Sequence, residues 1–132
     1  KRRNFDSGAV RDVVDGKGRC DLLPLLQVSR FLGGDRCLYF MGMYIATGNI
    51  CFLYNAIGEF SKKAFTDDYT AMLETAKQYE DGAKKYDDRN WEKGMHVHCF
   101  IDSAGRHYLK YCRGDKDEPH DRAVLWNLFG AI

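Results

Sequence analysis

Polar side chains that could hold a cation or a polyphosphate gather in the last third of the chain, residues 100–127. Two segments there have helical character, 100–113 and 119 onward, and an acidic turn over 115–119 joins them. At about 100° per residue, Asp102 and Arg106 lie about 40° apart on the first helix, and His120 and Asn127 about 20° apart on the second. The sequence therefore predicts a polar cluster at the joined end of two helices, made of Asp102, Arg106, His107, Asp117, Glu118, His120, Asp121 and Asn127.

This mixture of carboxylates, imidazoles and a guanidinium suits a divalent cation bound to phosphates. Mg²⁺ takes oxygen ligands and usually keeps several waters, so two or three carboxylates are enough. Histidine can shuttle a proton or contact a phosphate near working pH. The alternative is purely structural, with Arg106 paired to Asp102 across one helical turn. We predict a Mg²⁺ (or Mn²⁺) site at Asp102, Asp117, Glu118 and Asp121, with Asp102, His107, Asp117 and His120 as catalytic residues.

A second candidate is the glycine-flanked turn GKGR at residues 16–19. Backbone N–H groups and cations together can hold phosphates, so Lys17 and Arg19 are predicted substrate contacts. The GxxxxGK[ST] spacing of a P-loop is absent. The alternative is a surface turn whose cations are solvated.

The segment 87–98 carries further candidates. The loop DDRNWEKG holds Asn90 and Trp91, and a tryptophan in a loop that ends in glycine could stack its ring on a ligand. The alternative is a tryptophan that closes over the core. His96 and His98 are predicted to lie on an extended segment, where alternation places both on one side as a potential metal pair.

The elements that position these residues are predicted to be helices. Leu25–Phe31 follows Pro24 and ends at a Gly-Gly break, and Asp35 is a predicted N-cap of a helix that runs to about residue 46. Further helices are expected over residues 50–63, after Thr66 or Asp67 up to 86, and in the last third. We therefore predict an all-α protein: a single domain over 1–132, with an extended arm at 1–24 and a compact helical part at 25–132.

Composition restricts the function further. The chain of 132 residues has a formal net charge of +1, which argues against broad or stable binding to nucleic acid. It has no apolar run that could span a bilayer and no visible signal peptide. Five cysteines without a CxxC pair favour a reducing compartment. We expect a cytoplasmic protein that does not bind membranes.

Three ordered motifs carry a resemblance to a known family: GAVRD with GKGRCDLLP, then YEDGAKKYDDRNWEKG, then IDSAGRHYLKYCRGDKDEPHDRAVLWN. They resemble the small, largely phage-encoded dATP/dGTP diphosphohydrolase (N-terminal) family, which is associated with MazG-like nucleotide pyrophosphohydrolases, including the MazZ proteins. The resemblance covers nearly the whole chain except residues 35–68.

The resemblance implies a MazG-like helical bundle that cleaves a purine (deoxy)nucleoside triphosphate to monophosphate and pyrophosphate, in the cytoplasm of an infected bacterium if the chain is phage-encoded. The matched polar positions are Gly16, Lys17, Arg19 and Asp21, then Lys85, Tyr86, Asn90, Trp91 and Gly94, then Asp102, Arg106, His107, Asp117, His120 and Asn127. Of these, Lys17, Arg19, Lys85, Asn90, Trp91, Arg106 and Asn127 are the expected substrate contacts.

One departure keeps other functions open. MazG-type enzymes hold magnesium with an ExxE pair and an ExxD pair, and this chain has no ExxE. A phage protein that binds a nucleotide signal without turnover is one alternative, because cations can bind phosphates without activating a water. A metal phosphohydrolase of the HD type, using His107 and the His120-Asp121 pair, is another. A structural or interaction module is the third.

The segment 35–63 indicates that the chain forms an oligomer. Its helices carry apolar residues on more than one face, whereas a surface helix of a small monomer has one apolar stripe. A symmetric homo-oligomer covers such helices, and the related MazG-like enzymes are dimers or tetramers. We expect at least a dimer, with Phe40, Tyr44 or Phe52 at the contact.

Overall fold

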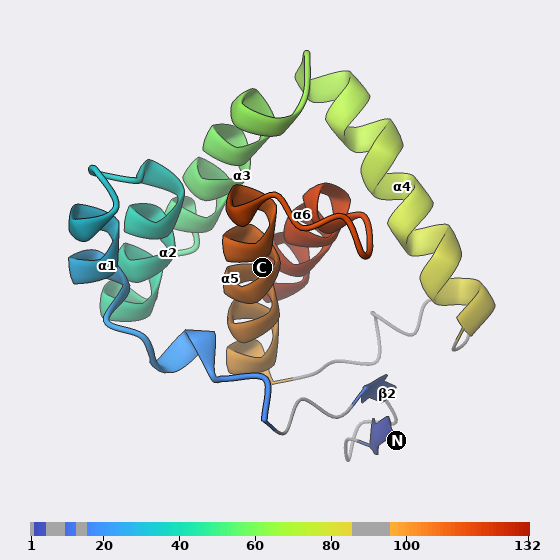
Figure 1. Cartoon of the computed structure of the whole chain (residues 1–132), viewed down its shortest axis with the longest axis horizontal. Helices are drawn as coiled ribbons and strands as arrows, with labels where there is room; N and C mark the ends of the chain where they lie inside the picture. The colour runs from blue at the N-terminus through green and yellow to red at the C-terminus, as the bar shows by residue number, and fades with distance from the viewer. Residues whose placement is uncertain (1, 5–9, 13–15, 86–95) are drawn as a thin grey trace.

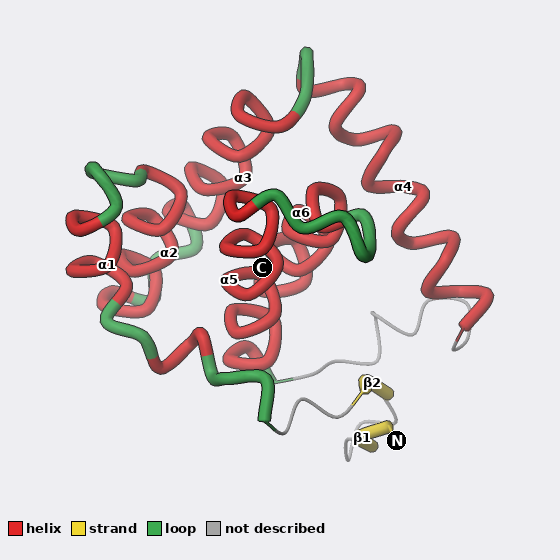
Figure 2. The backbone as a smooth tube through the Cα atoms, in the orientation of Figure 1, coloured by secondary structure: helices red, strands yellow, loops and turns green. Residues whose placement is uncertain are grey.

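In the computed structural model, the described elements are helices and one short antiparallel pair of strands in the arm. The structure describes residues 2–4, 10–12, 16–85 and 96–132 (Figure 1). The described elements are β1 (Arg2–Asn4), β2 (Val10–Asp12), a 3₁₀ turn η1 (Cys20–Leu22), α1 (Leu25–Phe31), α2 (Arg36–Thr47), α3 (Cys51–Ala64), α4 (Asp68–Lys85), α5 (Val97–Arg113) and α6 (His120–Ala131). β1 and β2 pair antiparallel, with Arg2 opposite Asp12 (Figure 2). The all-α prediction is confirmed.

The pair α5 and α6 forms the centre of the molecule. In Figure 1, α1 to α3 lie on one side of this pair and α4 on the other. The largest fully buried side chains come from α2, α3, α5 and α6, and they are Leu38, Met41, Leu53, Phe60, Ile101, Tyr108, Val124, Leu125 and Leu128. Burial of these apolar groups stabilises the arrangement that positions the ends of α5 and α6.

Local signals set most helix ends as predicted. The Asp35 carboxylate caps α2, because its Oδ1 accepts the Leu38 N–H at 2.9 Å. Asp67, rather than Thr66, caps α4 through a 2.7 Å bond from the Thr70 N–H. Gly114 ends α5 with a φ of 91°, the left-handed conformation that glycine adopts at little cost.

The extended segment predicted at His96 and His98 is wrong. α5 begins at Val97, three residues before its expected start, so His98 lies in its first turn and His96 is the N-cap residue. Cys99 and Phe100 are buried, so this first turn extends the apolar face of the helix. The two imidazole rings stack with their centroids 5.5 Å apart.

The 3₁₀ turn η1 anchors the end of the arm on α5. The Cys20 backbone N–H donates to Oδ1 of Asp102 at 2.6 Å. A Cβ on Gly105 would lie 3.2 Å from the Cys20 Cβ, so a glycine on α5 lets the arm approach closely.

Across residues 16–85 and 96–132, no helix combines the length and the apolar character needed to cross a membrane.

Candidate functional site

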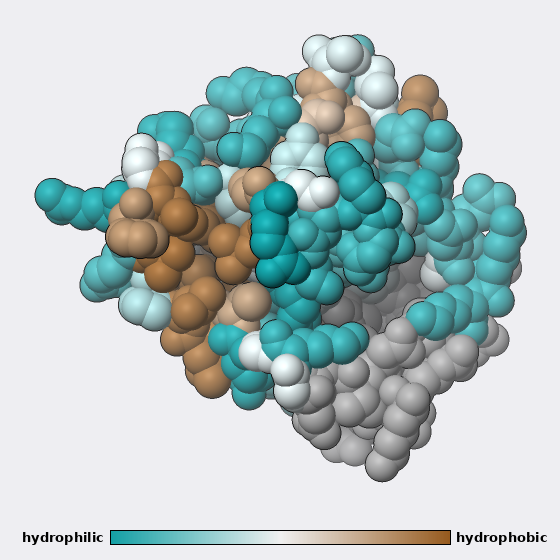
Figure 3. All heavy atoms as spheres, viewed as in Figure 1, coloured by the Kyte–Doolittle hydropathy of each residue, from teal (hydrophilic) through white to brown (hydrophobic). Residues whose placement is uncertain are grey.

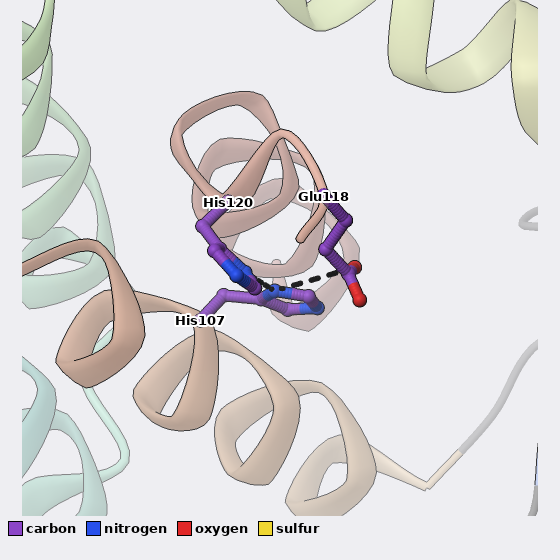
Figure 4. Close-up of side chains that lie close together, drawn as sticks. All are labelled: His107, Glu118 and His120. Carbon is purple, nitrogen blue, oxygen red and sulfur yellow. Dashed lines mark hydrogen bonds and ion pairs between the residues drawn. The ribbon is translucent and has the colours of Figure 1, made fainter. Parts of the chain in front are cut away.

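Two histidines and a glutamate meet where α5 and α6 are joined (Figure 4). His107 comes from α5, Glu118 from the turn before α6, and His120 is the first residue of α6. The Nδ1 atoms of His107 and His120 are 2.8 Å apart, and Oε1 of Glu118 is 3.8 Å from the His107 Nδ1. The structure therefore brings together three of the side chains predicted to form a polar cluster.

Asp117 extends this cluster to solvent. Its Oδ1 lies 2.7 Å from Nε2 of His120; the His120 side chain is 1% exposed and the Asp117 side chain 59% exposed. The hydrogen bond from His120 lowers the pKa of Asp117 below its ordinary value. The buried imidazole of His120 is thus held from both ring nitrogens, by a carboxylate on one side and by His107 on the other.

The proton positions in this chain follow from its donors and acceptors. An ionised carboxylate only accepts hydrogen bonds, so Nε2 of His120 carries a hydrogen toward Asp117. Between the two Nδ1 atoms, one nitrogen must donate and the other accept. The chain Asp117–His120–His107 can therefore carry a proton between the exposed carboxylate and the imidazole on α5.

Asp115 belongs to the same turn, although it was not among the predicted site residues. Oxygen atoms of Asp115 and Asp117 and a ring nitrogen of His120 lie within 4.8 Å of one another. The Arg113 guanidinium holds Asp115 through two hydrogen bonds and lowers the pKa of its carboxyl. The run of three carboxylates at 115–118 is the sequence signal that could have identified Asp115.

Asp102 and Arg106 form a separate cluster that faces the arm. Nη2 of Arg106 donates to both Asp102 oxygens, at 2.7 and 2.6 Å, and to the Gly18 carbonyl at 2.6 Å. Asp102 also accepts the Cys20 N–H, and its side chain is only 4% exposed. At about 100° per residue, His107 lies about 140° around α5 from Asp102. The structure therefore does not place Asp102 in either metal-compatible group of the described residues.

Asp121 also lies outside these groups. Its Oδ1 accepts the N–H of the next residue, Arg122, at 2.7 Å. His120 and Asp121 are neighbours in sequence but point about 100° apart on α6. The structure therefore gives no support to an HD-type arrangement in which this pair binds one metal.

The remaining predicted substrate contacts are dispersed. Lys17 is exposed between Gly16 and Gly18, which have φ values of 80° and 91°. Arg19 pairs with Asp21 through two bonds of 2.8 and 2.7 Å, so its charge is already compensated. Asn127 is buried and its Nδ2 donates to the Ala123 carbonyl. Lys85 is exposed at the end of α4, and Tyr86, Asn90, Trp91 and Gly94 lie outside the described residues.

The fold and this site define the chain as an all-helical protein with a histidine–carboxylate cluster at a helix–helix junction. The family model described as dATP/dGTP diphosphohydrolase, N-terminal, matches residues 65–132, which is slightly more than half of the chain and includes α4, α5 and α6. The chain therefore belongs to the dATP/dGTP diphosphohydrolase, N-terminal, family, whose name denotes a hydrolase. The arm and α1 to α3 lie outside the matched range. Neither the curated proteins nor the solved structures gave a match.

Proposed function

We propose that this chain hydrolyses a purine deoxynucleoside triphosphate to the monophosphate and pyrophosphate. The observation that carries the proposal is the His107–His120–Asp117–Glu118 cluster, which lies inside the range matched by the diphosphohydrolase family model. Pyrophosphate release requires a water to attack a phosphorus atom, and a cluster of imidazoles and carboxylates open to solvent can position that water and take its proton.

The roles of the side chains follow from their geometry. His107 accepts a proton from the attacking water, because its ring lies at the more exposed end of the hydrogen-bonded pair. His120 accepts the Nδ1 proton of His107 across their 2.8 Å contact, and Asp117 stabilises the His120 imidazolium that forms. The family name specifies dATP and dGTP, which motivates the choice of purine substrates.

Magnesium enters this proposal as part of the substrate. Both metal-compatible groups of the described residues contain an imidazole nitrogen, whereas Mg²⁺ prefers oxygen ligands only. Asp102 and Asp121 do not join these groups, so the described residues do not fit the predicted resident Mg²⁺ site. A triphosphate supplies its own oxygen ligands, and Mg²⁺ is commonly held by substrate phosphates with one or two carboxylates. No step of the proposed reaction depends on a resident Mg²⁺ ion.

The test is incubation with each of the eight common (deoxy)nucleoside triphosphates and Mg²⁺, with the products resolved by chromatography. We expect pyrophosphate and a purine deoxynucleoside monophosphate. His107→Gln should lower the rate about 10²–10⁴-fold, the usual contribution of a general base. Glu80→Gln, a change at an exposed residue on α4 paired only at 3.6 Å with Lys84, is the matched control and should leave the rate unchanged.

A second candidate is nucleotide binding without turnover. It is favoured by the pairing of Arg19 with Asp21 and of Arg106 with Asp102, which leaves few charges to stabilise a reacting phosphate. Nucleotide binding would then raise the melting temperature, since a ligand at a hundred times its Kd adds about 2.7 kcal/mol. Thermal stabilisation by dATP or dGTP with no product after long incubation would replace the hydrolase proposal with this one. Neither stabilisation nor product would favour an interaction module.

A further inference from the structure

The donor atoms at the α5–α6 junction are close enough to bind a single ion. One ring nitrogen of His107, one of His120 and one carboxylate oxygen of Glu118 all lie within 4.8 Å of one another. Figure 4 shows the two imidazoles facing each other with the Glu118 carboxylate beside them. These three side chains come from two helices and a turn that the buried core holds in place.

The distances between the donor atoms are close to the distances between ligand atoms in a metal site. Tetrahedral Zn²⁺ with bonds of 2.0–2.1 Å to nitrogen and oxygen requires ligand atoms roughly 3.3 Å apart. The Nδ1–Nδ1 distance of 2.8 Å and the Nδ1–Oε1 distance of 3.8 Å lie on either side of this value. Shifts of about half an ångström would bring these two distances to the tetrahedral value, and the remaining pair of donors, on His120 and Glu118, lies within 4.8 Å. Glu118 lies on an exposed turn, where such a shift costs little packing.

Asp117 supplies a second, independent feature of metal sites. A metal-binding histidine almost always donates its other ring N–H to a carboxylate or carbonyl, which fixes the tautomer and directs a nitrogen lone pair at the ion. Here Oδ1 of Asp117 is 2.7 Å from Nε2 of His120. The lone pair of His120 is thereby placed on Nδ1, the atom that faces His107.

The ligand types and the exposure indicate the class of ion. Two imidazoles and one carboxylate suit Zn²⁺, Fe²⁺ or Ni²⁺ better than Mg²⁺ or Ca²⁺, which take oxygen ligands. The His120 side chain is 1% exposed, His107 17% and Glu118 50%, so the cluster is closed on one side and open to solvent on the other. A catalytic zinc site has this form, with three protein ligands and one position left for water or substrate.

We propose that His107, Glu118 and His120 bind one divalent transition metal ion of the Zn²⁺ class, with Asp117 as the positioning residue behind His120. The proposal concerns the site of the proposed function but does not need turnover, because binding is measured without nucleotide. If such an ion is bound, His107 and His120 would be its ligands and His107 would not act as the proton acceptor; the chemistry that the ion would supply is a lowered pKa of a water bound to it.

The test is titration of the full, untagged chain with Co²⁺, followed by its visible absorption, and displacement of Co²⁺ by Zn²⁺. We expect one ion per chain, the intense bands of four-coordinate Co²⁺, and no competition from equimolar Mg²⁺. Glu118→Gln, a change on an exposed turn, should weaken binding at least tenfold. Asp117→Asn removes no ligand, and it should weaken binding roughly 10–100-fold because it removes the carboxylate that orients His120.

Two control variants locate the binding. His98→Gln tests the stacked His96–His98 pair at the start of α5, and Glu80→Gln tests a general charge effect; both should leave the Co²⁺ affinity unchanged. A thiolate-to-cobalt charge-transfer band should be absent, because the described cysteines are not part of the cluster. The proposal is overturned if Co²⁺ and Zn²⁺ do not bind at a one-to-one ratio, or if Glu118→Gln and His107→Gln both bind as tightly as the parent chain. Hydrolysis by a chain that binds neither ion would overturn this proposal and leave the proposed function intact.

Discussion

At the scale of single residues, Asp102 has the structural role that the sequence offered as the alternative, a pair with Arg106 across one helical turn, and it also holds the arm through the Cys20 N–H. Its carboxylate accepts hydrogen bonds from Arg106 and from the Cys20 N–H, and it is buried between α5 and the arm. The Nε of Arg106 is buried and has no hydrogen-bond partner among the described residues. The guanidinium therefore depends on Asp102 and the Gly18 carbonyl for compensation of its charge.

Asp102→Asn should destabilise the protein by about 3 kcal/mol or more, because removing one partner of a buried ion pair leaves the other charge uncompensated. Urea unfolding followed by circular dichroism measures the change. Glu80→Gln removes an exposed pair with Lys84 and should cost under about 1 kcal/mol. Equal losses for the two variants would contradict a structural role of the Asp102–Arg106 pair.

Asp21 provides a pH-dependent contribution to stability. Its hydrogen bonds from Arg19 lower the pKa of its carboxyl in the folded state. A group whose pKa is lower in the folded state stabilises the fold above its unfolded pKa, about 3.9 for aspartate, and loses this effect as the pH falls. Asp21→Asn should therefore lower the urea midpoint at pH 6, and its difference from the parent should vanish below the folded pKa of Asp21. A difference that stays constant from pH 6 to pH 2 would disprove the linkage.

Lys17 remains the better candidate of the two arm cations for a phosphate contact, because Arg19 is paired with Asp21. Lys17→Ala should weaken nucleotide binding by roughly 1.5–3 kcal/mol, the range for a charge-assisted hydrogen bond. Isothermal titration with dGTP in the presence of Mg²⁺ measures the loss. Lys77→Ala, a change on the exposed face of α4, is the control; affinities that match the parent in both variants would remove the arm from the substrate site.

At the scale of elements, the sequence predicted the helices better than it predicted their mutual rotation. The caps Asp35 and Gly114 and the helix Leu25–Phe31 follow from local rules, which act over a few residues. The same helical period that placed Asp102 beside Arg106 also turns His107 away from both. Packing between distant segments determines which face of α5 contacts α6 and which contacts η1. Because Asp102 and His107 lie on different faces of α5, they belong to different clusters.

The packing of α5 on α6 depends on Gly130. A Cβ at this position would lie 2.2 Å from a ring carbon of Phe100, whose side chain is buried and packs against Trp126. Gly130→Ala should therefore cost about 1–3 kcal/mol, as overpacking of a core usually does. Gly58→Ala is the matched control, because its Cβ meets nothing within 4 Å on α3, and it should stabilise by about 0.5–1 kcal/mol. Thermal melts of both variants test the contrast, and a neutral Gly130→Ala would show that Phe100 can move aside.

At the scale of the whole molecule, an apolar surface lies over α1 and α2 (Figure 3). The residues expected at an oligomer contact are partly enclosed instead: Phe40 and Phe52 stack with centroids 6.3 Å apart, and Phe40 and Tyr44 pack against the core. The exposed apolar side chains of α1 to α3 include Phe31 at 87% and Ile45 at 50%. The sequence thus predicted an excess of apolar residues but not which of them reach the surface.

We propose that the chain forms a homo-oligomer through this α1–α2 surface, because burial of exposed apolar area favours association. Light scattering at micromolar concentration should give at least twice the mass of one chain. Phe31→Asp and Ile45→Asp should reduce the mass to that of a monomer. Leu73→Asp changes an exposed apolar residue on α4, on the other side of the central helix pair, and should not alter it; a monomeric parent chain would refute the proposal.

The hydrogen bond between η1 and α5 makes it possible to measure whether the arm is docked on the helix. The Cys20 amide sits just after an irregular turn, where amides normally exchange with solvent quickly, yet it donates to a buried carboxylate at 2.6 Å. Its hydrogen–deuterium exchange should therefore be slow while the arm is docked and should accelerate whenever the arm lifts from the helix. Because Arg106 holds the Gly18 carbonyl and the same carboxylate, a phosphate that drew this guanidinium away would release both contacts together. The exchange rate of the Cys20 amide would then report whether a ligand bound at the arm changes the contact between the arm and α5.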